Sequence, residues 1–161
     1  MKRILILFCF IPALVLGAPQ KLPITLQANK IIADQKNGVM TYIGNVVIKQ
    51  GSMILRADKA RVTGKPGNPE HISAWGSLLH IQHVLDGELV HAWARRAEHK
   101  INSNIIDLYN DAKIHQGKDT LKAQHIRYDI NKEKVIAETR DGRAPVRAIL
   151  FPRKNTDKGA S

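Results

Sequence analysis

Apolar and polar residues alternate along most of this chain, and residues that favour turns interrupt the alternation at short intervals. In residues 22–28 an apolar side chain occupies every second position. Alternation with a period of two is typical of a strand that buries one face. Pro23 fits either an edge strand or the start of a strand, because it cannot donate a hydrogen bond to a ladder.

Turn signals separate runs of about five to twelve residues that are rich in Val, Ile, Leu, Thr and Tyr. They occur at residues 37–38, 44–45, 50–51, 64–69, 76–77, 86–87, 102–104, 110–111, 116–117, 131–132 and 141–142. Asn37 with Gly38 favours a type I′ turn, in which both central residues have positive φ. Residues 93–100 have helix-forming composition but lack an N-cap, so we expect a strand that ends in a turn. The whole pattern predicts an all-β sandwich, jelly roll or related roll.

One unit of this pattern occurs twice. Residues 42–62 align with residues 108–128 at an offset of 66, and six of the 21 aligned positions are identical. The identities are Ile48/Ile114, Gln50/Gln116, Gly51/Gly117, Leu55/Leu121, Ala57/Ala123 and Arg61/Arg127. A supersecondary unit that recurs at a fixed offset indicates an architecture of stacked hairpins.

The chain of 161 residues is long enough for one domain. Residues 1–18 combine Lys2 and Arg3 with an apolar run and small residues, which predicts a cleaved signal peptide. We expect the domain to span residues 19–152 and a disordered basic tail to follow at 153–161. The only cysteine, Cys9, lies in the predicted signal peptide, so the exported chain is expected to fold without disulfides.

The formal net charge of +11 favours anionic partners. For an exported protein these are phosphorylated lipids and anionic saccharides, and we expect no nucleic-acid partner. A soluble basic surface without a specific ligand is the alternative.

The sequence offers no pattern for catalysis, a cofactor or a metal site. The histidines are His71, His80, His83, His91, His99, His115 and His125. His80 and His83 would face opposite sides of a strand, and no triple with metal-ligand spacing occurs. We expect the histidines to be solvated or to lie at an interface. A nucleophile elbow and paired carboxylates are also missing, so we do not expect an enzyme.

The inward phase of the expected strands is aliphatic. Its candidate groove residues are Ile24, Leu26, Val46, Ile48, Leu55, Ala57, Ile81, Ile106, Leu108, Ile114 and Leu121, and Ala92 and Ala123 share the phase. Such an interior is either a filled core or a space for acyl chains, depending on how tightly the roll closes.

The two terminal strands, near residues 22–28 and 145–151, are apolar and could pair with another chain. The candidate pairing residues are Leu22, Ile24, Thr25, Leu26, Val146, Ala148 and Leu150. Alternatively, the two ends pair with each other and close the fold.

Several segments resemble the OstA-like family of periplasmic lipopolysaccharide transport proteins. They are LPITLQANKIIA at 22–33, YIGNVVIKQGSMILRADKARV at 42–62, AWG at 74–76, IIDLYNDAKIHQGKDTLKA at 105–123, IRYD at 126–129 and VRAILFP at 146–152. The most specific parts are GNV-x-I-x-QG and ADK-x-x-V. The similarity covers the chain from about residue 20 to residue 152.

The resemblance implies a twisted, slightly open antiparallel β-jelly roll, located in the periplasm, that carries lipopolysaccharide between the two membranes. It also implies end-to-end assembly into homo-oligomers and pairing with an LptC-like inner-membrane protein and an LptD-like outer-membrane protein. Lipid contact is then expected near Ile24 and Leu26, and pairing at residues 146–151. The alternatives are an LptC-like protein, a periplasmic β-domain that binds polyanions by charge alone, or a purely structural protein that assembles end to end.

Overall fold

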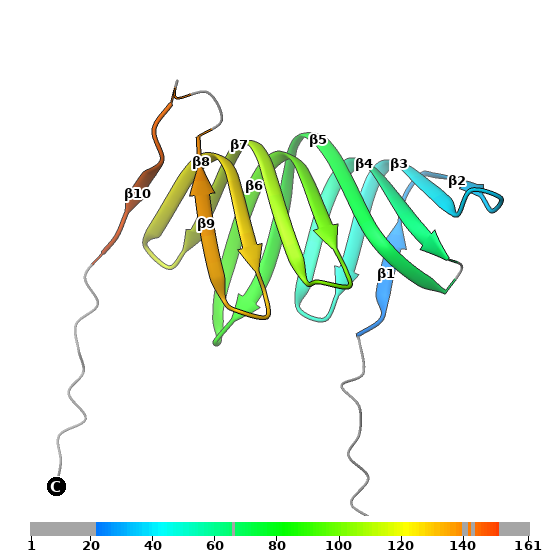
Figure 1. Ribbon diagram of the computed structural model, residues 1–161, viewed down its shortest axis with the longest axis horizontal. Coiled ribbons are helices and arrows are strands. Elements are labelled where there is room, and N and C mark those ends of the chain that lie inside the picture. The colour runs from blue at the N-terminus through cyan, green and yellow to red at the C-terminus, as the bar shows by residue number, and fades with distance from the viewer. Residues whose placement is uncertain (1–21, 66, 140–141, 143, 152–161) are drawn as a thin grey trace, which may run out of the picture.

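The computed structural model describes residues 22–65, 67–139, 142 and 144–151 (Figure 1). The predicted signal peptide and the predicted tail lie outside these residues. The described strands are β1 (Ile24–Gln27), β2 (Lys30–Asp34), β3 (Val39–Gln50), β4 (Met53–Lys65), β5 (Asn68–Leu85), β6 (Glu88–Lys100), β7 (Ile105–Gln116), β8 (Asp119–Asp129), β9 (Lys134–Glu138) and β10 (Arg147–Ile149). Within the described part of the chain, no helix is long and apolar enough to cross a membrane.

The strands form one antiparallel sheet of consecutive hairpins. Its order is β1-β3-β4-β5-β6-β7-β8-β10, while β2 also pairs with β3 and β9 also pairs with β8. Figure 1 shows β1 and β2 at one end of the long axis and β9 and β10 at the other. The expected all-β roll of stacked hairpins is thus confirmed, and residues 93–100 are the strand that we expected.

Several expected turns are found where the sequence placed them. The chain reverses at residues 51–52, 86–87, 101–104, 117–118 and 130–133. At Asp86 and Gly87 both φ angles are positive, 49° and 79°. The type I′ expectation for residues 37–38 is wrong: the turn spans residues 35–38, and only Gly38 among them has a positive φ.

Three other expected turns are β-bulges. Residues 44–45, 76–77 and 110–111 lie inside β3, β5 and β7, where the ladders shift register. Each bulge places extra residues on one strand, which bends the strand and increases its twist. Asp58 in β4 stabilises the β5 bulge, because its carboxylate accepts a hydrogen bond from the Ser77 amide at 2.9 Å.

The bulges lie along one line across the sheet and divide each long strand into two halves. Along this line β1 gives way to β2, and the Asn29 amide donates a hydrogen bond to the Gly44 carbonyl at 2.9 Å. The sheet folds over at the line, so that inward residues of both halves form one core. Ile48, Leu55 and Ile81 come from one half, and Ile72 and Leu108 come from the other.

The two ends of the sheet do not meet. Among the described residues β1 contacts only β3, and β10 contacts only β8. The alternative in which the terminal strands close the fold within one molecule is therefore wrong. The jelly roll is open, as its predicted class required.

Candidate functional site

All of the candidate groove residues lie in the interior. Five are buried in the core: Val46, Ile48, Leu55, Ile81 and Leu108. The other six are partly buried and pack against that core: Ile24, Leu26, Ala57, Ile106, Ile114 and Leu121. The alternation along the strands therefore identified the inward face correctly, and contact of these residues with a lipid stays a prediction.

The centre of the interior is filled. The space that remains between Ile48, Leu55, Ile72 and Ala74 is a cavity of only about 20 Å³, which holds about one water molecule. Small side chains let the two halves approach here, since Ala60, Ala74, Ala94 and Ala97 are all buried. The residues at this centre form a filled core in the structure, and their contact with a lipid stays a prediction.

A much larger cavity opens along the rim opposite the bulge line. Its volume is about 570 Å³, which lies within the range of small-molecule sites. It is lined by Leu22, Gln50, Met53, Ile81, His83, Leu85, Val90, Ala92, His99, Ile101, Asn104, Ile106, Leu108, Ile114, Gln116, Tyr128, Ile130, Asn131 and Val135. Leu22 precedes β1 at one edge of the sheet and Val135 lies in β9 at the other, so the cavity extends from edge to edge.

Only four of the candidate groove residues line this large cavity: Ile81, Ile106, Leu108 and Ile114. The sequence interpretation missed Leu85, Val90, Ile101, Ile130 and Val135. Leu85 continues the alternating phase of Ile81, and Ile130 continues that of Tyr128, so the same period of two could have identified them. They were missed because they lie next to turns.

Burial favours the neutral form of two histidines that line the cavity. Burial, followed by the charge of His71, lowers the pKa of His99 to about 4. Burial also lowers the pKa of His83, whose Nδ1 lies 2.9 Å from the Ser52 hydroxyl. Of the two expected settings, solvent or an interface, solvent does not hold for His99, which is only 8% exposed. An uncharged lining suits an apolar ligand.

The remaining histidines do not gather around a metal. Among the described residues, no group of three or more His, Cys, Asp or Glu side chains could hold a metal ion. His80 and His83 face opposite sides, as predicted: His80 stacks with His91 and Trp93 on the outer face, while His83 lines the cavity.

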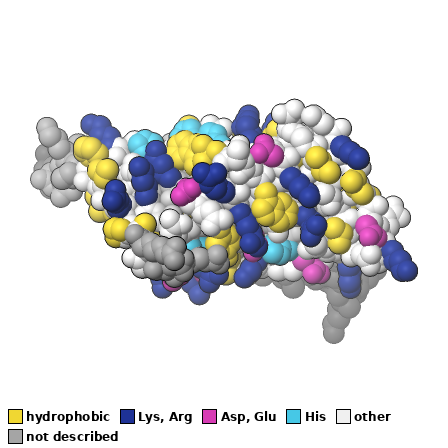
Figure 2. Space-filling view, turned by 90° about the horizontal axis from the view of Figure 1, so that it is seen from above, with side chains coloured by type: hydrophobic (Ala, Val, Ile, Leu, Met, Phe, Trp, Pro, Cys, Tyr) yellow, Lys and Arg dark blue, Asp and Glu magenta, His cyan; other side chains and the backbone are white. Residues whose placement is uncertain are grey.

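The outer face carries most of the charge. Figure 2 views the molecule from above and shows Lys and Arg side chains along its whole length, with fewer Asp and Glu side chains between them. Asp107 is fully buried on this side. Burial opposes its ionisation, but hydrogen bonds from Arg127 at 2.8 Å and from His125 at 2.7 Å outweigh burial and hold the pKa of Asp107 below its usual value.

The candidate pairing residues lie at the two open edges. Ile24 and Leu26 are half-buried in β1, opposite Gln50 and Ile48 of β3, and Thr25 between them is exposed. At the far edge Ala148 pairs with Leu121. Val146 and Leu150 flank β10 with 39% and 74% of their surface exposed. Within the described part of the chain, both edges thus present apolar side chains on strands that pair on one side.

This architecture matches known proteins over most of its length. The family described as LptA/(LptD N-terminal domain) LPS transport protein matches residues 25–134. The lipopolysaccharide export system protein LptA of Haemophilus influenzae is 28% identical over 134 residues, which cover 81% of this chain and 77% of the relative. LptA of Escherichia coli K12 is 27% identical over 152 residues, which cover 92% of this chain and 81% of the relative.

A solved structure shares the fold. The crystal structure of Pseudomonas aeruginosa LptH superposes with a TM-score of 0.73 at 25% sequence identity, and the match covers 81% of this chain and 96% of that one. LptH is described as the LptA-homologous periplasmic component of the conserved lipopolysaccharide transport device. The expected class of transport protein and the expected periplasmic location are thereby confirmed. The chain therefore belongs to the family of lipopolysaccharide transport proteins that comprises LptA and the N-terminal domain of LptD.

Proposed function

We propose that this chain carries lipopolysaccharide through the periplasm by shielding its acyl chains in the large rim cavity. The observation that supports this most is the extent of the cavity, from Leu22 beside β1 to Val135 in β9. A lining that continues from one open edge to the other suits a ligand that passes from one molecule to the next. Of the candidate groove residues, Ile81, Ile106, Leu108 and Ile114 line this cavity, while Ile24 and Leu26 pack against the core in the edge strand β1.

The physical reason is the cost of exposing acyl chains to water. Each methylene group that leaves an apolar environment costs about 0.8 kcal/mol, so a lipid with several chains cannot cross an aqueous gap alone. The open rim keeps the chains covered while the saccharide stays in water. The groove lowers this cost but supplies no direction, so the energy for transport comes from a partner.

We further propose that molecules join end to end. Each ladder from β1 to β10 is antiparallel, so these two strands run in opposite directions. A second copy in the same orientation can therefore place its β1 beside β10 and continue the antiparallel sheet. Leu22, Ile24, Thr25 and Leu26 would meet Val146, Ala148 and Leu150. The same edges would receive an LptC-like inner-membrane protein and an LptD-like outer-membrane protein.

We also propose that residues 1–18 are a cleaved signal peptide and that residues 19–152 form the transport domain, followed by a short basic tail at 153–161. Mass spectrometry of the exported protein would test the cleavage site directly. A mature protein that begins far from residue 19 would contradict this division.

Two neighbouring residues of β9 test the groove. Val135 lines the cavity, whereas Ile136 pairs with Arg127 on the outer face. Both are partly exposed, at 45% and 36%, so either can carry a charge in the folded chain. Val135→Asp should weaken lipopolysaccharide binding about tenfold, because it removes apolar contact and places a carboxylate in the groove. Ile136→Asp is the matched control.

The measurement is a fluorescence titration of purified protein with lipopolysaccharide, with circular dichroism as the check on folding. Equal binding by the two folded variants would contradict the groove.

A salt titration of the wild type distinguishes the proposed function from its rival, in which a β-domain binds polyanions by charge alone. Binding by charge should collapse as salt rises, whereas binding through buried acyl chains should survive.

A further inference from the structure

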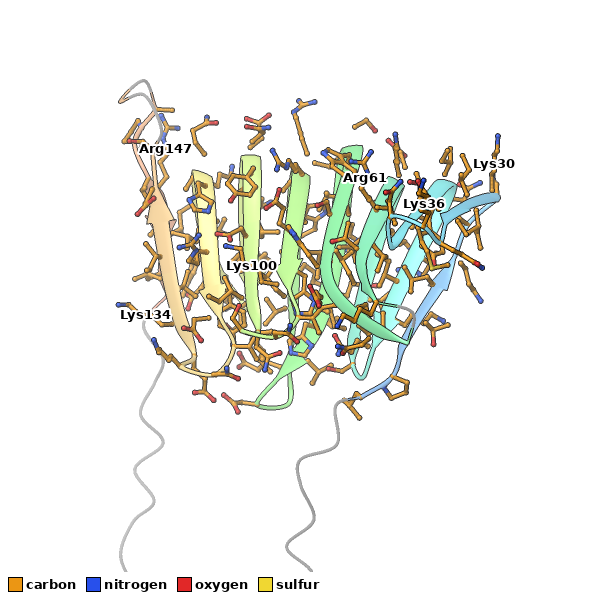
Figure 3. All side chains as sticks on the ribbon, turned by 45° about the vertical axis from the view of Figure 1, so that its right-hand side comes forward. Lys30, Lys36, Arg61, Lys100, Lys134 and Arg147 are labelled. Carbon is orange, nitrogen blue, oxygen red and sulfur yellow. The ribbon has the colours of Figure 1, made fainter. Side chains whose placement is uncertain are left out.

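Three cationic side chains form a row across three neighbouring strands near the C-terminal edge of the sheet. Lys113 of β7 pairs with Lys122 of β8, and Lys122 pairs with Arg147 of β10. Directly opposed residues share one face of a sheet and bring their side chains close together. Figure 3 shows Arg147 at the end of the molecule that lies away from Lys30 and Lys36.

The same three side chains line a second cavity, of about 340 Å³, on the outer face. Asp111 and Gln124 also line it. The Asp111 carboxylate is already engaged by Arg95, whose Nε lies 2.8 Å away. Among the described residues, none of the three cations forms an ion pair with a carboxylate. Among the described lining residues, the three cations therefore outnumber the carboxylates, and the Asp111 carboxylate is already paired with Arg95.

We propose that Lys113, Lys122 and Arg147 form a binding site for a phosphate group, and that the bound phosphate fastens β10 to β8. The site does not depend on the rim cavity, which lies on the other face of the sheet.

The chemistry of the three side chains fits a phosphate group. The Arg147 guanidinium can bind two phosphate oxygens at once, and the lysines supply point charges and further donors. The Lys113 ammonium lies 4.9 Å from the centre of the Trp93 ring, which positions the first cation of the row. The Gln124 amide can donate a hydrogen bond to a phosphate oxygen.

The position of the site gives the phosphate a structural effect. β10 is short and, among the described strands, pairs with β8 alone, through Arg147, Ala148 and Ile149. At its far end the Phe151 amide donates a hydrogen bond to the Asp119 carboxylate at 2.8 Å. At its near end Arg147 faces a like charge, which weakens the pairing. A dianion between Arg147 and Lys122 replaces this repulsion with attraction, so β10 should be held at both ends.

The test uses the purified mature chain and isothermal titration with inorganic phosphate, at an ionic strength held constant with NaCl. Lys122→Gln should weaken phosphate binding about tenfold or more, as expected for the loss of a hydrogen bond between charged groups. Lys49→Gln is the matched control, because Lys49 is exposed on the same face and its opposed neighbours are Thr25 and Ile54. It should change binding less than about twofold.

A second ligand identifies the source of the phosphate. Equal binding of inorganic phosphate and glucose 1-phosphate would support a site that recognises phosphate alone. Binding of glucose 1-phosphate alone would support a site for a phosphorylated saccharide. Binding of neither, or equal binding by Lys122→Gln and Lys49→Gln, would overturn the proposal.

Hydrogen exchange tests the effect on β10. Phosphate should slow exchange at residues 147–149 of the wild type and of Lys49→Gln, but not of Lys122→Gln. Equal slowing in all three proteins would overturn the fastening of β10. Lipopolysaccharide binding, measured in parallel, reports on the rim cavity separately, because its loss would count against the proposed function and not against this site.

Discussion

At the scale of single residues, His99 shows how the interior differs from the surface. It lies in β6 opposite Ile72 and Ile106, and its buried Nε2 has no hydrogen-bond partner among the described residues. Burial lowers its pKa from 6.5 to about 4. The unfolded chain therefore binds a proton at higher pH than the folded chain does, so stability rises with pH between these two values.

This gives a prediction for stability against pH. The contribution of His99 should be fully present above pH 6.5 and should decline as the pH falls towards 4. Between pH 7 and pH 5 the wild type should lose about 2 kcal/mol more of its free energy of unfolding than His99→Phe loses. Burial lowers the pKa of His80 and His83 as well, so the difference between the two proteins is the informative quantity.

Urea denaturation at pH 7 and pH 5 provides the measurement. Equal losses in the wild type and in His99→Phe would contradict the burial of a neutral imidazole. The alternation along its strand places His99 on the inward face but does not predict how much of its side chain is exposed. That exposed fraction depends on residues of the opposite half of the sheet, which lie far away in the sequence.

At the scale of elements, the bulges explain both a success and an error of sequence interpretation. The repeated unit is real: residues 44–45 and 110–111 occupy equivalent places in the β3–β4 and β7–β8 hairpins. Both sites have positive φ angles, 78° and 49° in β3 and 63° and 56° in β7. Tight turns favour Gly, Asn and Asp as well, because these residues tolerate positive φ angles. A bulge differs from a tight turn because the strand pairs with the same neighbouring strand again after it. In β3, for example, Val46 pairs with Ala57 of β4 directly after the bulge.

Asn45 tests the strain at a bulge. It is exposed and has a φ of 49°, so substitution alters the backbone preference with little change in packing. Asn45→Ala should lower the free energy of unfolding by about 1 kcal/mol, because a side chain with Cβ and no local hydrogen bond disfavours this conformation. Asn45→Gly should be neutral or stabilising.

Thermal and urea denaturation would measure both variants, with Lys49→Ala as a control in the regular part of the same strand. A loss for Asn45→Ala no larger than that for Lys49→Ala would show that the bulge imposes no such constraint.

At the scale of the whole molecule, the alternation predicts an inward face but not how much space that face encloses. At the centre, buried alanines such as Ala74 and Ala97 let the two halves come together and leave almost no cavity. At the rim, Leu85 and Val90 line open space. The distance between halves depends on side chains that are far apart in the sequence, so the filled core and the groove could not be separated from the pattern alone.

The open edges make a second prediction at this scale. Cysteine occurs only at position 9, in the predicted signal peptide, so single cysteines can be introduced into the mature chain. Thr25→Cys in β1 and Ile149→Cys in β10 lie on the same face at opposite ends of the sheet. When the two variants are mixed, disulfide-linked dimers should form, because end-to-end pairing brings the two positions together.

Non-reducing electrophoresis would measure these dimers. Lys59→Cys, on the outer face of β4 in the middle of the sheet, is the control partner. If Thr25→Cys links to Lys59→Cys as readily as to Ile149→Cys, the edges do not pair specifically.

We propose that one groove carries lipopolysaccharide from edge to edge of the sheet, and photo-crosslinking in living cells tests this most directly. Leu22 and Val135 lie at opposite ends of the cavity, and Ile136 lies on the outer face of the same strand as Val135. A photoreactive residue is introduced at each of these three positions in turn. We predict lipopolysaccharide adducts from both cavity positions and none from position 136. Adducts from position 136 alone, or from all three positions equally, would contradict the groove.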